Sequence, residues 1–300
     1  MLHYFAVTLS IILGLSLLYV LYRTIIGRPV ERRIVFVYIA FAVALPLLMD
    51  FSAPVPITGE VQQLADALDK LQPGSKVLVA YDFDPPSAPE LQPMAVAFTR
   101  YALRRDLKLI IMGLWPQGPQ QAEQAFQTAL ADPEIAAKNL KYGVDYVNLG
   151  FQSGNEFVIQ SMGSGFKRMF PKDDRGTPYD SIPLVKNVFN FSNVDFIMEW
   201  SSGKPGTVEW VQIAVDRFGS RMGAGNTAVQ APQVYPYLRA GQLVGLLGGM
   251  SGAAEFERAV QEKGKASTFM LSQMIAHATV IAFILIGNAA FFTERKKRKK

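Results

Sequence analysis

The chain of 300 residues contains no cysteine and only two histidines, His3 and His277. Both histidines fall in long uncharged runs near the two ends, so residues 51–265 contain neither residue type. A disulfide framework, a cysteine- or histidine-based zinc site, a cysteine nucleophile and a Ser-His-Asp triad are therefore excluded for that stretch. The chemistry left to it uses carboxylates, lysine, tyrosine and hard cations bound by oxygen.

Charge is also scarce, because charged residues make up only 18% of the chain whereas half of all residues are apolar. Three uncharged runs, 2–22, 34–49 and 266–293, hold much of that apolar content. The first and third are long enough to cross about 30 Å of hydrocarbon as helices, and the second is short. We therefore predict two N-terminal transmembrane helices within residues 1–50 and one C-terminal transmembrane helix.

The basic residues indicate on which side of the membrane each segment lies. Four arginines fall between the first run and the start of the second, and six cations follow the third run within the tail, 294–300. By the positive-inside rule, both segments belong in the cytoplasm. Residues 51–265 carry a net charge of −2 and the rest of the chain +7. We therefore predict an extracytoplasmic domain on a plasma-membrane protein that contacts the lipid bilayer and binds no nucleic acid.

Between the apolar runs, short β-branched segments alternate with helical patterns about five times. The predicted strands are 76–83, 107–114, 145–149, 194–200 and 221–225. This alternation is typical of an α/β fold with a mostly parallel, doubly wound sheet, Rossmann-like or flavodoxin-like, of about five strands. A ligand would lie beyond the carboxyl ends of the strands, and the long polar insert 166–191 is placed to cover that edge or to contact a partner.

Carboxylates stand where two of these strands end. Asp82 and Asp84 mark the end of the first strand, Glu90 opens the following helix, and Glu199 lies near the end of the fourth strand. Such oxygen ligands suit a divalent metal in a glycan or phosphoester enzyme. Solvated loop carboxylates or a helix cap explain Asp82 and Asp84 as well. Catalysis and metal binding are therefore the alternative, and the preferred prediction has no cofactor.

Four further residues are candidates for ligand binding at the same edge. Trp115 and Trp200 follow or end strands, where aromatic rings can serve as platforms for a sugar or a peptide. Asn226 and Thr227 belong to a G-x-G-x-x-A stretch that resembles a dinucleotide turn, but no acidic residue stands about 20 positions later to bind a ribose. Packing in the core or in loops explains the two tryptophans equally well, and an ordinary glycine-rich strand-to-helix turn explains Asn226 and Thr227.

The C-terminal third contains two spacings that favour helix packing. Small residues recur every four positions and would line one helical face, packed against the same domain or a neighbouring subunit. They are Gly241, Gly245, Gly249 and Ala253. A polar stripe on the third run would seek a partner helix in lipid. Its members are Gln273, His277 and Asn288.

These observations lead to one preferred function and one alternative. We predict a membrane-anchored α/β module that is not an enzyme and that acts as an assembly or ligand-sensing subunit, in a homo-oligomer or with other membrane proteins. The alternative is a divalent-metal-dependent enzyme acting on glycans or phosphoesters through the strand-end carboxylates. No motif identifies the ligand, the partner or the stoichiometry.

Overall fold

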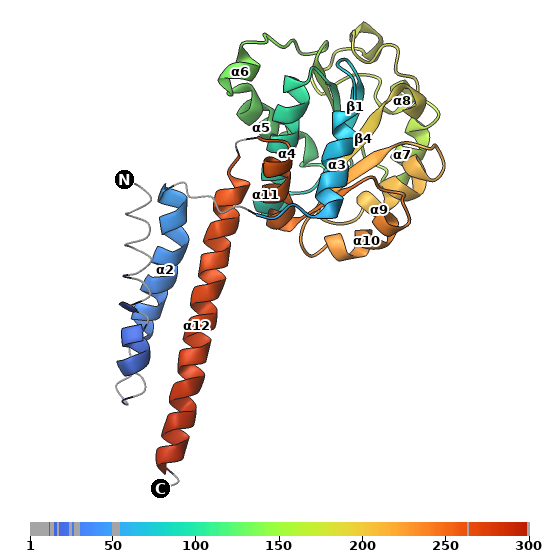
Figure 1. The fold of residues 1–300 in the computed structure, drawn as a ribbon. Helices are drawn as coiled ribbons and strands as arrows, with labels where there is room; N and C mark the ends of the chain where they lie inside the picture. The colour runs from blue at the N-terminus through green and yellow to red at the C-terminus, as the bar shows by residue number, and fades with distance from the viewer. Residues whose placement is uncertain are drawn as a thin grey trace. The chain divides into compact units, whose positions relative to one another are not determined.

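The computed structural model describes residues 55–262 and 264–298, together with residues 12, 15–16, 18–23, 26 and 31–49. The chain divides into two compact units, one comprising Pro54–Ser267 and the other comprising Met1–Ala53 with Thr268–Lys300. The ribbon is drawn in Figure 1. Most of the first predicted transmembrane helix, 2–22, lies outside the described residues.

A six-stranded, all-parallel sheet forms the centre of the unit Pro54–Ser267. Its strands are β1 (Lys76–Asp82), β2 (Lys108–Gly113), β3 (Tyr146–Phe151), β4 (Phe196–Ser201), β5 (Met222–Asn226) and β6 (Leu246–Gly248). The order across the sheet is β3-β2-β1-β4-β5-β6. Strands β2 and β3 thus lie on one side of β1 and strands β4 to β6 on the other, so the strand order reverses between β1 and β4. The predicted α/β fold with parallel strands is confirmed, and the five predicted strands correspond to β1 to β5.

Helices cover both faces of the sheet, as the buried side chains on both sides of β1 and β4 require. On one face, α11 packs against α3 and α4, and α4 packs against α5 (Figure 1). These helices are α3 (Gly59–Asp69), α4 (Ala88–Arg104), α5 (Gly118–Leu130) and α11 (Gly249–Ala259). Beside α4 and α5 lies the short α6 (Pro133–Ala136).

The opposite face is covered by shorter elements and by the polar insert. They are α7 (Glu156–Met162), α8 (Phe166–Met169), α9 (Thr207–Trp210), the π-helical turn Val211–Val215 and α10 (Ala231–Arg239). Three 3₁₀ turns, Pro85–Ser87, Tyr179–Ser181 and Phe191–Asn193, complete the domain. The insert contributes buried aromatic residues such as Phe166 and Tyr179 to this layer, so much of it belongs to the core rather than to a cover over the ligand edge.

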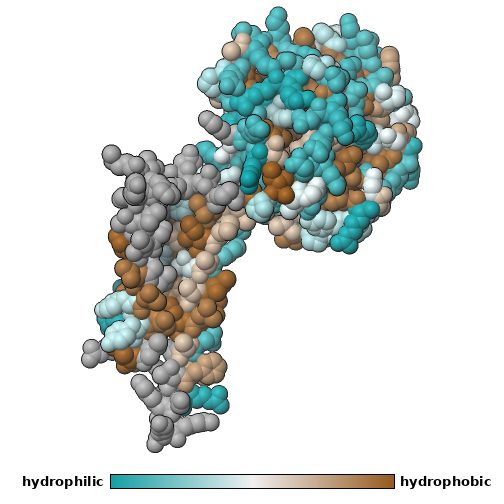
Figure 2. All heavy atoms as spheres, in the orientation of Figure 1, coloured by the Kyte–Doolittle hydropathy of each residue, from teal (hydrophilic) through white to brown (hydrophobic). Residues whose placement is uncertain are grey.

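The other unit contains two described helices, α2 (Arg32–Met49) and α12 (Ala266–Arg298). Within α12, the segment Ala266–Ala289 is long and apolar enough to cross a membrane, whereas α2 is a shorter apolar helix. The Ser272 hydroxyl donates to the Val43 carbonyl oxygen at 2.8 Å, so the two helices pack together. Figure 2 shows apolar residues along these helices. The predicted C-terminal apolar helix is thus confirmed, whereas its crossing of a membrane and the two N-terminal spans stay predictions.

The prediction that the small residues of the C-terminal third line one helical face is wrong. The chain there passes through a turn at Gly241, then strand β6, and enters α11 only at Gly249. Ala253 is buried within α11. A Cβ on Gly245 would lie 2.6 Å from the Glu60 carbonyl oxygen, so the close approach is to α3 of the same domain. The sixth strand forms because this segment pairs with β5 instead of forming a helix.

Candidate functional site

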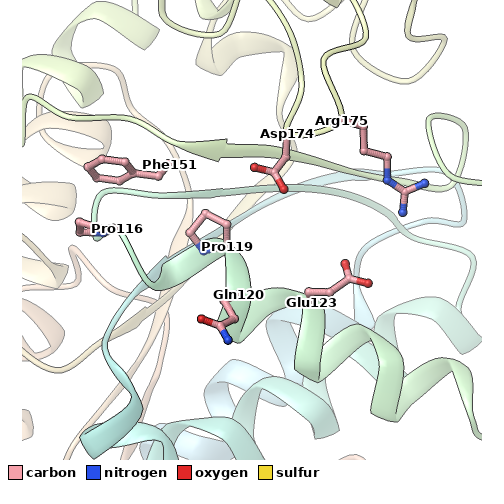
Figure 3. A pocket seen from close by; sticks show the side chains of 7 residues that line it. All are labelled: Pro116, Pro119, Gln120, Glu123, Phe151, Asp174 and Arg175. Carbon is pink, nitrogen blue, oxygen red and sulfur yellow. The ribbon is translucent and has the colours of Figure 1, made fainter.

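Two adjoining cavities lie at the carboxyl edge of the sheet, among the loops that follow β2, β3 and β4. The larger cavity has a volume of about 520 Å³ and is lined by Pro116, Pro119, Gln120, Glu123, Phe151, Asp174 and Arg175 (Figure 3). The smaller has a volume of about 300 Å³ and is lined by Leu114, Trp115, Pro116, Phe151, Ser153, Asn155, Lys204 and Pro205. Because the two cavities share Pro116 and Phe151, we treat them together as the edge site.

The loop between β2 and α5 supplies residues to both cavities, and glycines allow it to approach β1 closely. A Cβ on Gly113 would lie 2.8 Å from the Tyr81 carbonyl oxygen, and one on Gly118 would overlap the same oxygen. The indole N–H of Trp115 donates to the Pro205 carbonyl oxygen at 2.8 Å. This bond joins the loop after β2 to the loop after β4, so the two walls of the smaller cavity are tied together.

Asp82 is a buried carboxylate that holds the loop after β2 in place. Its Oδ1 accepts the Leu114 backbone N–H at 2.6 Å, and its Oδ2 accepts the Trp210 indole N–H at 2.7 Å. The side chain is fully buried, and this burial raises the pKa of Asp82 to about 7, although both hydrogen bonds act to lower it. Asp82 therefore fixes the loop after β2 to α9, and each carboxylate oxygen already has a protein donor.

Glu199 belongs to a second buried network between β4 and β5. The Thr207 hydroxyl donates to Glu199 Oε2 at 2.5 Å, and the Asn226 amide donates to the Thr207 oxygen at 2.7 Å. Within the described residues, Glu199 Oε1 and Asn226 Oδ1 have no hydrogen-bond partner. Burial, assisted by the negative charge of Asp82, raises the pKa of Glu199 well above its ordinary value. A carboxyl group in this setting favours its neutral form.

The remaining carboxylates proposed from the sequence have separate partners. Asp84 accepts the Ser87 hydroxyl at 2.9 Å, and Glu90 accepts the Ala228 backbone N–H at 2.8 Å. Among the residues that the structure describes, no group of three or more His, Cys, Asp or Glu side chains is placed to hold a metal ion. The alternative of a metal enzyme built on Asp82, Asp84, Glu90 and Glu199 thus gains no geometric support.

The structure separates the four residues proposed for ligand binding. Trp115 lines the smaller cavity, whereas Trp200 is fully buried and packs edge to face on Phe98 with 5.6 Å between ring centroids. The alternation of side chains along β4 points Trp200 to the α4 side of the sheet and Glu199 to the α9 side. Asn226 belongs to the buried network, and the Thr227 carbonyl oxygen accepts the Gln230 N–H before α10. Trp115 is therefore the member of the four that lines the edge site.

Sequence reasoning missed the residues that define the larger cavity. Phe151 ends β3, Glu123 lies on α5, and Asp174 and Arg175 come from the polar insert, which reaches β3 where the Asp174 N–H donates to the Asn148 carbonyl oxygen at 3.0 Å. The length and polarity of the insert were the available signal. They indicated its place near the ligand edge without identifying the side chains involved.

Comparisons with known proteins identified no relative of this chain. No protein-family model, curated protein or solved structure matches the chain. The functional conclusion accordingly depends on the geometry of the edge site. That site combines aromatic and proline surfaces with charged and amide groups.

The polar stripe proposed for the C-terminal helix lies on exposed positions of α12. Gln273, His277 and Asn288 are all exposed, and the Asn288 amide donates to the Ile284 carbonyl oxygen of its own helix at 3.0 Å. The contact with α2 uses Ser272 instead. The role of the stripe in contacts with a partner helix stays a prediction.

Proposed function

We propose that this protein is a membrane-anchored module that binds a small molecule at the edge site and serves as a ligand-sensing or assembly subunit of a membrane complex, without catalysing a reaction. The observation that carries the proposal is the pair of adjoining cavities at the carboxyl ends of the parallel strands. Doubly wound sheets bind ligands at this edge, and volumes of about 300–1,000 Å³ are typical of small-molecule sites.

The buried polar networks support binding rather than chemistry. Asp82 and Glu199 are enclosed and hydrogen-bonded to the protein, so neither presents a free carboxylate to a substrate. Asp82 holds the loop that carries Trp115 and Pro116. A site whose walls are fixed in this way loses little conformational entropy when a ligand binds.

We further propose that the domain lies outside the cytoplasm and that α12 anchors it in the plasma membrane, alongside two N-terminal spans. Support comes from the apolar length of Ala266–Ala289 and from the cations at both short polar ends. Partner contacts in the bilayer would use the exposed polar stripe of α12.

Ligand binding is tested with the full chain in mild detergent. Thermal unfolding is recorded against a library of amino acids, sugars, nucleotides and short peptides, because a ligand at 100 times its Kd stabilises the folded state by about 2.7 kcal/mol. We expect one chemical class to raise the Tm, and Phe151→Ala to weaken that ligand at least about tenfold. Phe157→Ala is the matched control, since Phe157 is exposed on α7 and lines neither cavity.

Two results would contradict the binding proposal: no compound raises the Tm, or the ligand stabilises Phe151→Ala as strongly as the wild type. Membrane placement has its own test, because the natural chain has no cysteine. An impermeant maleimide should label Lys172→Cys in intact cells and Lys296→Cys only after lysis. Labelling in the opposite order would reverse the proposed orientation.

A further inference from the structure

We infer that the larger cavity of the edge site binds a zwitterionic α-amino acid with an apolar side chain. This ligand class rests on the proposed function, whose site it specifies. The inference combines a preorganised guanidinium, two carboxylates and an apolar wall that line the same cavity. Each of these groups matches one part of an amino acid.

Arg175 supplies the positive charge. Its guanidinium carbon lies 3.5 Å from the centroid of the Tyr142 ring, so the planar group is stacked and its edges stay available. The backbone below it is fixed by Asp173, whose Oδ1 accepts the N–H groups of Arg175 at 3.0 Å and of Thr177 at 2.7 Å. The Tyr142 hydroxyl donates to the other oxygen of Asp173 at 3.0 Å, which connects the stacked ring to the same turn.

No ion pair joins Arg175 to any other residue in the described part of the chain. Its guanidinium hydrogen-bond donors are therefore not used by carboxylates of the described residues, and Arg175 is one of the residues that line the cavity. A guanidinium binds a carboxylate through two parallel hydrogen bonds, which fixes both the position and the plane of the ligand group. This geometry suits the carboxylate of an amino acid.

The other lining groups follow a definite order in the view of Figure 3. Phe151 and Pro116 lie at one end of the cavity and Arg175 at the other, with Asp174 and Glu123 between them. The Asp174 carboxylate accepts no hydrogen bond from the described residues, and Glu123 accepts one from the exposed Gln127 amide at 3.2 Å. Both carboxylates can therefore receive an ammonium group.

The order of these groups corresponds to the order of groups on an α-amino acid. Its carboxylate, ammonium group and side chain all branch from one carbon, so the carboxylate can meet Arg175 while the ammonium group meets Asp174 and Glu123. The side chain then covers Phe151 and Pro116. A simple anion would meet two carboxylates of like charge, and a simple cation would meet Arg175. A neutral sugar would leave all three charges without a partner.

Calorimetric titration of the full chain in mild detergent tests this ligand class. The probes are L-phenylalanine, 3-phenylpropionate, which lacks the ammonium group, and L-phenylalaninamide, which lacks the carboxylate. We expect L-phenylalanine to bind at least about tenfold more tightly than either analogue. Arg175→Gln should weaken L-phenylalanine by about 10- to 100-fold and strengthen the amide, because it removes the repulsion of a simple cation. Arg168→Gln, at an exposed arginine outside the cavity, is the matched control.

A second variant tests the ammonium position by reversing the preference of the site. The double substitution Glu123→Gln with Asp174→Asn should weaken L-phenylalanine and strengthen 3-phenylpropionate, because it removes the repulsion of a simple anion. Glu156→Gln, at an exposed glutamate on α7, should change neither affinity. A variant that merely unfolded would lose both ligands, so the expected reversal separates a specific effect from misfolding.

Equal affinities for L-phenylalanine and 3-phenylpropionate would overturn the inference, as would an unchanged affinity for L-phenylalanine in Arg175→Gln. Different outcomes decide the proposed function. If a sugar or a nucleotide binds in a manner that depends on Phe151 and amino acids do not, the ligand class is wrong and the binding function stands. If no compound binds in a Phe151-dependent manner, both are wrong.

Discussion

The substitution Trp210→Phe removes one of the two N–H groups that hold the buried Asp82 carboxylate. Trp210 and Asp82 are both fully buried, and the indole N–H lies 2.7 Å from Oδ2. Burial raises the pKa of Asp82 from its ordinary 3.8 to about 7. The side chain is therefore mostly ionised at pH 8 and mostly protonated at pH 5. The cost of losing the indole donor must then depend on pH.

The magnitude follows from the two forms of the acceptor. A hydrogen bond to a charged group contributes about 1.5–3 kcal/mol to stability, whereas one between neutral groups contributes about 0.5–1.5 kcal/mol. Trp210→Phe should therefore lower the free energy of unfolding by about 1 kcal/mol more at pH 8 than at pH 5. Loss of the donor also raises the pKa of Asp82 further, so the stability of the variant falls more steeply with pH than that of the wild type.

The wild type sets the reference for this comparison. Between pH 3.8 and about 7, folded Asp82 holds a proton that the unfolded chain has released, so stability falls as the pH rises through this window. The interval is about three pH units, which corresponds to at most about 4 kcal/mol from this one group. Glu199 acts in the same direction, because burial raises its pKa as well.

Urea unfolding of the full chain in mild detergent, followed by tryptophan fluorescence, measures these effects. All three tryptophans lie in the unit Pro54–Ser267, so two reporters remain after either substitution. Trp115→Phe is the matched control, since its indole N–H donates to the Pro205 carbonyl oxygen, which does not titrate. Its cost should be the same at pH 5 and pH 8. An equally pH-independent cost of Trp210→Phe would refute the role given to Asp82.

Two further predictions concern packing and the second buried carboxyl. Gly245→Ala should destabilise the domain by about 1–3 kcal/mol in urea unfolding, because the new methyl group meets α3, while Gly59→Ala, with open space around it, should cost less than about 0.5 kcal/mol. Glu199→Gln should keep the Thr207 hydrogen bond and reduce the loss of stability between pH 5 and pH 8, because the amide does not titrate. An unchanged pH dependence of the free energy of unfolding would show that the pKa of Glu199 is not raised in the folded protein.

Most of the strands and their parallel arrangement were predictable because β1, β2 and β4 are compact apolar runs, each followed by a helical pattern, whereas β3 and β5 gave weaker signals. The sixth strand was not, since its three residues, Leu246–Gly248, lie among glycines whose spacing suggested a helix. Its strand conformation depends on pairing with β5 and on α3 packing against Gly245. These contacts join segments that are distant in the sequence.

The candidate site was predictable in location but not in composition. Asp82 was singled out, yet its burial depends on donors 32 and 128 residues away, at Leu114 and Trp210. Phe151 and Arg175 carried no local signal, because their cavity is assembled from two strand ends, a helix and the polar insert. Trp200, a candidate for the ligand edge or for core packing, is fully buried against Phe98 of α4, a contact between segments about 100 residues apart that no local pattern reveals.

Hydrogen–deuterium exchange of the full chain, with and without a saturating pool of amino acids, sugars and nucleotides, tests most directly whether the edge site binds a small molecule. A ligand seated between Phe151 and Arg175 should slow exchange in the segments 114–118, 151–157 and 173–177, which surround the two cavities. Slower exchange confined to other segments, or none at any segment, would contradict the assignment of the edge site.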